Sequence, residues 1–399
     1  MSSARIAPSA ASVPYSRIRE LAETAMRLDA EAPADDRVLK LYFGESNIPT
    51  PDFIKQAAQQ AMADGFTYYT ENAGMLSTRQ ALARYYGALH NVDLDPVRNI
   101  VVTNSGVQAL NVGIRCLLDP GDEAIVLTPA WPNGSAIAQM ANAVVKQVAH
   151  PLRGDRYGID FEAIEAALSP RTRMILYTSP SNPTGWVATE EDQERLLELC
   201  RSRGIWLMAD EVYERLWYNT GELGTAVPTI LKRARPDDPV IVVQSFSKAW
   251  CMTGWRVGWM ISRPDLVARA GQLNEFIISC PTGFAQKAAE VALAQGEASV
   301  REMLAGFKRN RDLCLQALNR MPGVRTPMPD GAFYLFPRID GLTDSFNFCR
   351  ELLLQTKVGL APGVAFGNGG EGSIRICYAS EPHILASAMA RLEAFLRSR

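Results

Sequence analysis

The chain has 399 residues, of which 47% are hydrophobic, so it is long enough to bury a large core and to form two domains. The charges of its 41 basic and 43 acidic residues nearly cancel, so the chain has no excess of positive charge for binding nucleic acid and no polybasic membrane segment. No run approaches the roughly 20 apolar residues that span a bilayer, and the first twenty residues hold no stretch typical of a signal peptide. We therefore expect a soluble, cytoplasmic protein without nucleic-acid or membrane partners.

The cysteines and histidines argue against metal and disulfide chemistry. The seven cysteines are an odd number, widely scattered and without a C-x-x-C pair, which favours buried free thiols over disulfides or zinc. The three histidines, at positions 90, 150 and 383, have no suitable spacing to carboxylates or cysteines. We expect no metal site and no histidine-based triad.

Taken in chain order, the first 14 residues are rich in Ser, Ala and Pro and predict a flexible arm, followed by a helical pattern over 16–28. From residue 99 to about 262, short apolar runs alternate with helical segments. This alternation predicts a mainly parallel sheet with helices on both faces. The expected strands are 100–103, 124–128, 143–148, 174–178, 205–209, 240–243 and 257–261.

The character of the sequence changes after Pro281. Long helical patterns over 284–294 and 299–321 lead to short expected strands around 332–336 and 373–378, and the glycine-rich stretch 367–372 is expected to be a loop. The predicted fold class is therefore α/β, with a large domain on a mainly parallel seven-stranded sheet between helices and a smaller α+β domain. The expected domain boundaries are 48–290 for the large domain, and 15–47 with 291–399 for the small domain, after an arm over 1–14.

The segment 245–256 places Lys248 directly after an expected strand, and ligands of open α/β sheets bind beyond the carboxyl ends of strands. The alternative is a solvated surface lysine, but neighbours such as Trp250 and Trp255 are too apolar for a solvated face. Desolvation lowers the pKa of a lysine toward its neutral, nucleophilic form, which attacks carbonyl carbon. An aldehyde cofactor such as pyridoxal phosphate is expected, and the nearby phosphate-binding residue types are Ser245, Ser247 and Arg256.

Other expected strands also end in polar or aromatic residues. The turn at 104–110 opens a helix whose free N–H groups can receive a phosphate, and Trp131 could either stack on a flat ring or belong to the core. Asp210 follows an apolar strand and needs a cationic partner, which could be a pyridinium nitrogen or a protein arginine. Asn182, in a rigid turn, and Tyr213 would hydrogen-bond the 3-oxygen of the cofactor.

With these residues assembled, the chain resembles the fold-type I pyridoxal phosphate enzymes, specifically the class I/II aminotransferases of the aspartate aminotransferase superfamily. The resemblance runs from about Tyr15 to the C-terminus. It rests on Ser-Asn-Pro-Thr-Gly at 181–185, Asp-Glu-Val-Tyr at 210–213, Ser-Phe-Ser-Lys at 245–248 with Gly-Trp-Arg at 254–256, and Ile-Arg-Ile-Cys-Tyr-Ala at 374–379. It implies pyridoxal 5'-phosphate as the cofactor and transfer of an amino group from an L-amino acid to a 2-oxo acid by a ping-pong mechanism.

The resemblance also implies a role for each matching residue. Lys248 would hold the cofactor covalently and carry the proton, Asp210 would pair with the ring nitrogen, and Tyr213 completes the expected catalytic set. The expected cofactor-binding residues are Ser105, Gly106, Val107, Trp131, Asn182, Asp210, Tyr213, Ser245, Ser247, Lys248, Arg256 and Tyr69. The expected substrate-binding residues are Arg375, which would grip the α-carboxylate, Asn182, Gly44 and Trp131.

Two of these assignments have wider consequences. Tyr69 matches a tyrosine that reaches the phosphate of the neighbouring subunit, which implies an obligate homodimer with shared active sites. Arg375 in a strand would point away from the side taken by Ile374 and Ile376, where its planar fork fits a carboxylate. Without the resemblance, a structural salt bridge would be the better interpretation of Arg375.

The expected amino donor is neutral or aromatic rather than aspartate. In the bacterial aspartate-preferring subgroup, a lysine often follows the phosphate-loop glycine and contacts a distal carboxylate, whereas this chain has Val107 there. A distal-carboxylate contact elsewhere in the chain stays open. A β-lyase or a cyclising synthase on the same scaffold would use the same cofactor residues. A non-catalytic sensory domain of a transcription regulator is disfavoured, because no basic helix-turn-helix segment precedes the domain.

Overall fold

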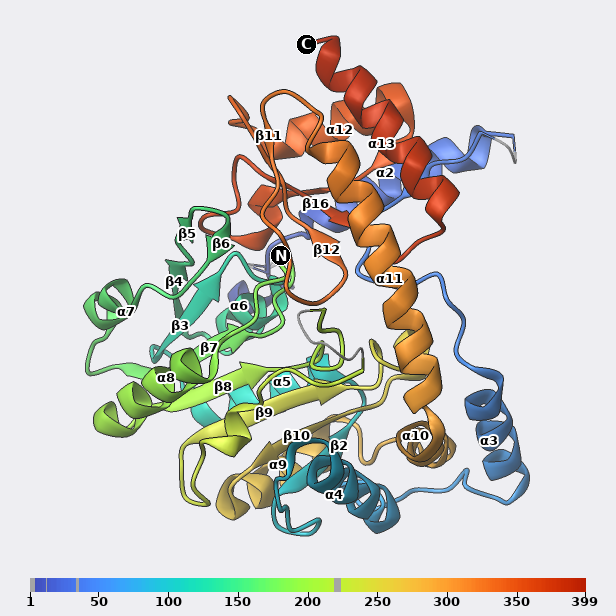
Figure 1. The fold of residues 1–399 in the computed structure, drawn as a ribbon. Coiled ribbons are helices and arrows are strands. Elements are labelled where there is room, and N and C mark those ends of the chain that lie inside the picture. Colours follow the sequence, from blue (N-terminus) through green and yellow to red (C-terminus); the bar gives the residue numbers. More distant parts are fainter. Residues whose placement is uncertain (1–3, 12, 34–35, 219–223) are drawn as a thin grey trace.

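The computed structural model describes residues 4–11, 13–33, 36–218 and 224–399 (Figure 1). Its centre is a seven-stranded sheet in the order β2-β10-β9-β8-β7-β3-β4. The strands are β2 (Ile100–Thr103), β3 (Glu123–Thr128), β4 (Val144–Ala149), β7 (Thr172–Thr178), β8 (Trp206–Asp210), β9 (Val240–Ser245) and β10 (Gly258–Ser262). β10 runs antiparallel to β2 and β9, and the other neighbouring pairs are parallel. The predicted α/β class and its mainly parallel sheet are confirmed.

The sheet is buried on both faces, which explains why its strands read as continuous apolar runs. In β9, Ile241 and Val243 join one core cluster while Val240 and Val242 join the other, because successive side chains of a strand point to opposite faces. Helices on the first face are α5 (Gly106–Leu117), α6 (Asn133–Met140) and α9 (Pro264–Ile277). Helices that contribute to the second core are α4 (Leu76–His90), α8 (Glu190–Arg203) and α10 (Gly283–Gln295).

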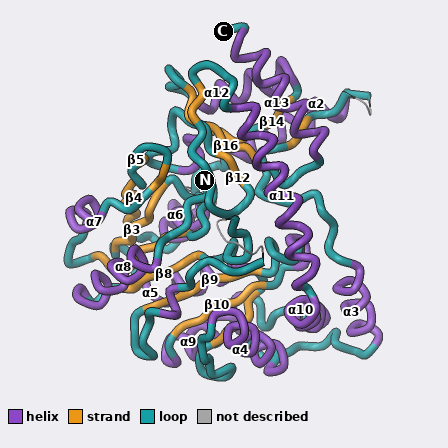
Figure 2. Tube along the Cα trace, in the orientation of Figure 1, coloured by secondary structure: helices purple, strands orange, loops and turns teal. Residues whose placement is uncertain are grey.

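The C-terminal part packs at the carboxyl-end side of this sheet, as Figures 1 and 2 show. A three-stranded antiparallel sheet, in the order β12-β16-β15, lies among helices there. The helices and strands of this C-terminal part are α11 (Glu297–Leu318), β11 (Val324–Arg325), β12 (Tyr334–Leu335), β13 (Arg338–Ile339), α12 (Ser345–Thr356), β14 (Val358–Gly359), β15 (Ala361–Pro362), β16 (Ile374–Cys377) and α13 (Pro382–Arg397). The expected loop over 367–372 is confirmed as turns before β16.

The described residues between 17 and 40 join this C-terminal part rather than the large sheet. Helix α2 (Arg17–Glu31) contacts α12, and β1 (Leu39–Lys40) pairs in parallel with β14. Ser16 caps α2, since its side chain accepts a hydrogen bond from the backbone N–H of Arg19. The remaining α-helices and strands are α1 (Pro8–Ala11), α3 (Asp52–Ala63), β5 (Leu152–Arg153), β6 (Arg156–Tyr157) and α7 (Phe161–Ala167).

The structure refines several expectations. The predicted helix 299–321 is α11, which begins and ends earlier, and Asp210 is the last residue of β8 rather than the first residue after it. The expected arm over 1–14 contains the short helix α1, and its residues 1–3 and 12 lie outside the described residues. The domain boundaries and the cytoplasmic location stay predictions. Within the described ranges, no helix combines the length and hydropathy that a bilayer crossing requires.

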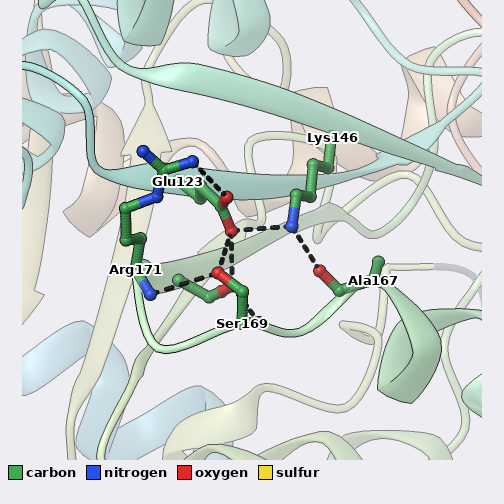
Figure 3. Close-up of polar contacts among 6 residues, drawn as sticks. Glu123, Lys146, Ala167, Ser169 and Arg171 are labelled. Carbon is green, nitrogen blue, oxygen red and sulfur yellow. Dashed lines mark hydrogen bonds and ion pairs between the residues drawn. The ribbon is translucent and has the colours of Figure 1, made fainter.

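A buried carboxylate ties together the amino ends of the sheet strands (Figure 3). Glu123, the first residue of β3, accepts hydrogen bonds from Lys146 Nζ at 2.7 Å and Ser169 Oγ at 2.5 Å. Thr172 Oγ1 adds a third bond at 3.2 Å, and Arg171 lies at 3.5 Å. The hydrogen bonds from Lys146 and Ser169 lower the pKa of the Glu123 carboxyl to about 2. This cluster is internally satisfied and joins β3, β4 and the loop before β7.

Candidate active site

The predicted site residues meet in one cavity of about 500 Å³, which lies beyond the carboxyl ends of the sheet strands. The structure brings together every predicted site residue except Tyr69. Those that line the cavity are Gly44, Ser105, Gly106, Val107, Trp131, Asn182, Asp210, Tyr213, Ser245, Ser247, Lys248, Arg256 and Arg375. They come from five strand ends of the large sheet, from the segment after β1 and from β16.

Lys248 lies three residues after β9 and points into the cavity, where its Nζ donates a hydrogen bond to the Gly44 carbonyl at 2.7 Å. The rings of Tyr213 and Phe333 lie 5.5 and 5.7 Å from Nζ, so aromatic surface replaces part of the surrounding water. This desolvation, helped by the charge of Arg375, lowers the pKa of Lys248 to about 8. A substantial fraction of the amine is therefore neutral, and nucleophilic, just above neutral pH.

Asp210 is buried and lacks a salt bridge within the described part of the chain. Its carboxylate accepts a long hydrogen bond of 3.4 Å from the Val212 N–H and a bond from the Thr178 side chain. Burial outweighs these contacts and raises the pKa of Asp210 to about 7. The alternative of a structural pair between Asp210 and a protein arginine is therefore wrong. A cation that entered the cavity would complete this carboxylate.

A group of small and hydroxyl residues forms the end of the cavity at β9, β10 and α5. Ser105 caps α5, and the Oγ atoms of Ser245 and Ser247 are 2.8 Å apart. The exposed Arg256 donates to the Thr253 carbonyl at 2.7 Å. These donors, together with the free N–H groups at the start of α5, suit a phosphate.

Gly258 on β10 is a site feature that the sequence reasoning missed. A Cβ atom there would lie 2.5 Å from both Ser105 C and Gly106 N, closer than any side chain tolerates. The glycine therefore allows β10 to run directly against the turn that opens α5. The sequence feature that could have identified Gly258 is its position two residues after Arg256, near the start of an expected strand.

Arg375 on β16 carries a buried charge without a carboxylate partner among the described residues. Its Nη1 donates to Asn182 Oδ1 at 2.8 Å, its Nη2 donates to the Tyr42 carbonyl, and its Nε has no hydrogen-bond partner in the described structure. Its guanidinium carbon lies 4.6 Å from the centre of the Tyr334 ring. The structural salt bridge considered for Arg375 is therefore wrong, and the cavity offers a planar cation to an incoming anion.

Other lining residues were not predicted from the sequence. Tyr334 Oη hydrogen-bonds Tyr213 Oη at 2.7 Å, and Thr178, at the end of β7, supports Asp210. Arg19 and Phe43 line the cavity from α2 and from the segment after β1. Thr178 was detectable as the last residue of an expected strand. The others come from segments far away in sequence, whose approach to the strand ends no local pattern indicates.

Tyr69 lies outside this cavity. It belongs to the connection between α3 and α4, and 89% of its surface is exposed. Its neighbour Tyr68 is 83% exposed. Two adjacent, largely uncovered tyrosines form apolar surface, which a partner could cover.

The residues present fit pyridoxal phosphate. Lys248 supplies an amine of lowered pKa for an aldehyde, and Asp210 supplies a carboxylate that lacks a cation. The phosphate-binding residue types lie together at one end of the same cavity, while Trp131 and Val107 form part of its apolar wall.

Comparison with known proteins agrees with this geometry. The family model for aminotransferase class I and II matches residues 37–392. An aspartate aminotransferase of Pyrococcus horikoshii is 34% identical over 96% of this chain and 94% of its own length. An aromatic-amino-acid aminotransferase of Thermococcus litoralis is 31% identical over 96% of each chain. The solved structure of an alanine aminotransferase from Pyrococcus furiosus superposes with a TM-score of 0.91, at 28% identity over 99% of this chain and all of that chain.

Proposed function

The chain belongs to the class I and II aminotransferases, whose members use pyridoxal 5'-phosphate, and we propose that it prefers a neutral or aromatic L-amino acid to aspartate as donor. The proposed reaction is ping-pong, with a 2-oxo acid as the acceptor. The observation that supports the donor preference is Val107, which follows the phosphate-loop residue Gly106 and lines the cavity.

The wall around Val107 is apolar. Val107 and Trp131 are half-buried and pack against the core cluster that contains Leu110, and all three residues line the cavity. A distal carboxylate placed against this wall would lose hydration without gaining a cation, whereas an apolar side chain would gain favourable burial. The similar proteins carry names for aspartate, aromatic and alanine transamination, so membership in the family leaves the donor open.

The proposed roles of the residues follow from their positions. When bound, the cofactor supplies a protonated ring that accepts the electrons left when the substrate Cα–H bond breaks. Lys248 would hold the cofactor and then, once released by the substrate, take the Cα proton on Nζ. Asp210 would keep the ring nitrogen protonated, and Tyr213 and Asn182 would donate to the 3-oxygen. Arg375 would bind the α-carboxylate through its fork.

The same proposal includes a homodimer in which Tyr69 reaches the phosphate of the partner subunit. The support is its 89% exposure, and the fact that Ser247 and Arg256 also line a second hollow, of about 700 Å³. We expect a dimer in sedimentation and a roughly 10-fold weaker cofactor affinity in Tyr69→Phe, the loss of one charge-assisted hydrogen bond. A monomer that binds the cofactor with wild-type affinity would contradict the shared site.

The donor preference is tested by mixing the purified, cofactor-loaded enzyme with single amino acids and following the cofactor spectrum. We expect faster conversion with alanine, phenylalanine or tyrosine than with aspartate. Conversion by aspartate far faster than by every neutral donor would contradict the proposal. Pyruvate, ammonia or a cyclic product formed without any 2-oxo acid would instead indicate the β-lyase or synthase alternative.

A further inference from the structure

Tyr334 is a cavity residue that has no role in the reaction described so far. It is the first residue of β12, it is fully buried, and it lines the cavity together with Tyr213 and Arg375. β12 pairs with β16 so that Tyr334 lies opposite Cys377, two residues after Arg375. The C-terminal part of the chain therefore places a phenol beside two residues that have proposed roles toward cofactor and substrate.

The Tyr334 hydroxyl has one hydrogen-bond partner in the part of the chain that the structure describes. That partner is Tyr213, whose Oη lies 2.7 Å from Tyr334 Oη. A Cβ atom at Gly44 would overlap Tyr334 Oη, so the glycine leaves the space that the hydroxyl occupies. The pair of hydroxyls is thus held in one place by the fold around it.

The direction of this hydrogen bond follows from the number of protons. Each hydroxyl has one proton to donate. If Tyr213 donates to the 3-oxygen of the cofactor, as proposed above, it has no proton left for Tyr334, so Tyr334 must donate to Tyr213. Burial raises the pKa of both hydroxyls, and the bond between them lowers the pKa of Tyr213 and raises that of Tyr334, as expected when Tyr334 donates. A hydroxyl that accepts a hydrogen bond is in turn a stronger donor.

The ring of Tyr334 contacts a different neighbour. The guanidinium carbon of Arg375 lies over the rings of Tyr334 and Phe366, 4.6 and 4.9 Å from their centres. Both rings are fully buried, and a cation–π contact is strongest where water is excluded. The two rings therefore restrict the orientation of the Arg375 fork before a carboxylate arrives.

We propose that Tyr334 is a positioning residue with two separable roles. Its hydroxyl holds Tyr213 as a donor to the 3-oxygen of the cofactor, and its ring holds Arg375 for the α-carboxylate of the substrate. The inference rests on the proposed function, because Tyr334 acts through residues whose roles are assigned there. The other ionisable side chains around the two hydroxyls are Asp210, Lys248 and Cys377.

The hydroxyl is tested by titrating the absorbance of the lysine-linked cofactor in the holoenzyme, a readout separate from turnover. Donation from Tyr213 withdraws negative charge from the 3-oxygen, so the nitrogen that links lysine and cofactor holds its proton less strongly. Tyr213→Phe should therefore raise the pKa of the absorbance change by about 1 to 2 units. Tyr334→Phe should raise it by about 0.5 unit, since it only weakens the donor. In the Tyr213→Phe background, Tyr334→Phe should add no shift.

Tyr378→Phe is the matched control. It removes a hydroxyl from another buried tyrosine pair, Tyr378 with Tyr218 at 3.3 Å, which does not line the cavity. The absorbance titration should not change. A shift in Tyr213→Phe with none in Tyr334→Phe would overturn the inference alone, and so would an equal shift from Tyr334→Phe in both backgrounds. No shift in either single variant would contradict the proposed role of Tyr213 as well.

The ring is tested by the dissociation constant of 3-phenylpropanoate, a carboxylate that cannot be transaminated, measured by calorimetry on the holoenzyme. Tyr334→Leu should raise this constant about 10-fold, whereas Tyr334→Phe keeps the ring and should leave it within about 2-fold of the wild type. Phe366→Leu should also raise it, but without a shift in the absorbance titration. An unchanged dissociation constant in Tyr334→Leu would overturn the role of the ring.

Discussion

Glu123 and Asp210 are buried carboxylates at opposite ends of the same sheet, and their surroundings differ in kind. Glu123, at the amino end of β3, is surrounded by donors, and its pKa falls to about 2. Asp210, at the carboxyl end of β8, has no cation in direct contact within the described residues, and burial raises its pKa to about 7. At one end the polar groups satisfy one another, and at the other they are left for a ligand. A buried carboxylate that faces a cavity without a cationic partner marks the functional end of the sheet.

The lysines beside the two carboxylates differ in the same way. Lys146 forms an ion pair with Glu123 at 2.7 Å and also donates to the Ala167 carbonyl at 2.8 Å (Figure 3). Lys248 donates to a single carbonyl, that of Gly44, and has a lowered pKa. Substitutions of Lys248 and Asp210 should therefore lower kcat, whereas substitutions of Lys146 and Glu123 should lower the free energy of unfolding and leave kcat unchanged.

The largest effect is expected from Lys248→Ala. It removes both the covalent attachment and the proton carrier, so kcat should fall by about 10⁴-fold and the lysine-linked absorbance should disappear. Lys146→Ala is the control and should keep the absorbance and kcat. Transamination by the Lys248 variant at the wild-type rate would refute the assignment of that lysine.

A smaller loss of rate is expected from Asp210→Asn. The volume is conserved, but the negative charge that keeps the ring nitrogen protonated is gone, so kcat should fall by about 10²- to 10³-fold. The covalent link to Lys248 should remain, and absorbance spectra with single-turnover kinetics would check both points. Wild-type kcat in this variant would contradict the role of Asp210.

Glu123→Gln should leave kcat unchanged and lower the free energy of unfolding by about 2 kcal/mol, because hydrogen bonds to a charged acceptor are lost. The folded pKa of Glu123, about 2, is below its ordinary value of 4.5. Its stabilisation is therefore complete above about pH 4.5 and is lost as pH falls toward 2. Urea unfolding at several pH values should show a weaker acid dependence in the variant than in the wild type.

The smallest effect is expected from Lys146→Ala as a stability variant. The lysine side chain is 31% exposed, so water screens its pair with Glu123, and the expected loss is about 1 kcal/mol. The same unfolding measurement applies. A loss larger than that of Glu123→Gln would show that the carboxylate is not the centre of the cluster.

The sequence predicted the sheet and most of the site for a physical reason. Parallel strands buried on both faces form continuous apolar runs, and residues a few positions after a run, such as Lys248 or Asn182, lie beyond the carboxyl ends of the strands, where ligands bind. Two-residue strands such as β1 and β14 carry no periodic signal, so neither these strands nor their pairing was predicted. Arg19 was missed because its place in the cavity depends on how α2 packs, which the sequence of α2 alone does not specify.

The sequence also could not decide whether Asp210 had a protein partner. That answer depends on which cations approach β8 in three dimensions, and the structure places none within salt-bridge distance in the residues it describes. The absence of a protein cation beside Asp210 is therefore a property of the tertiary structure. Whether the Asp210 charge destabilises the apoprotein and stabilises the cofactor-bound protein can be tested by measuring free energies of unfolding.

The most direct test is the stability of Asp210→Asn relative to the wild type at pH 8, measured by urea unfolding without and with pyridoxal phosphate. The folded pKa of Asp210, about 7, is above its ordinary value of 3.8, so its ionisation destabilises the apoprotein increasingly as pH rises toward 7. We expect the variant to be more stable than the wild type as apoprotein, by about 2 to 4 kcal/mol, and less stable when the cofactor is bound. A change of the same sign in both forms would contradict the account.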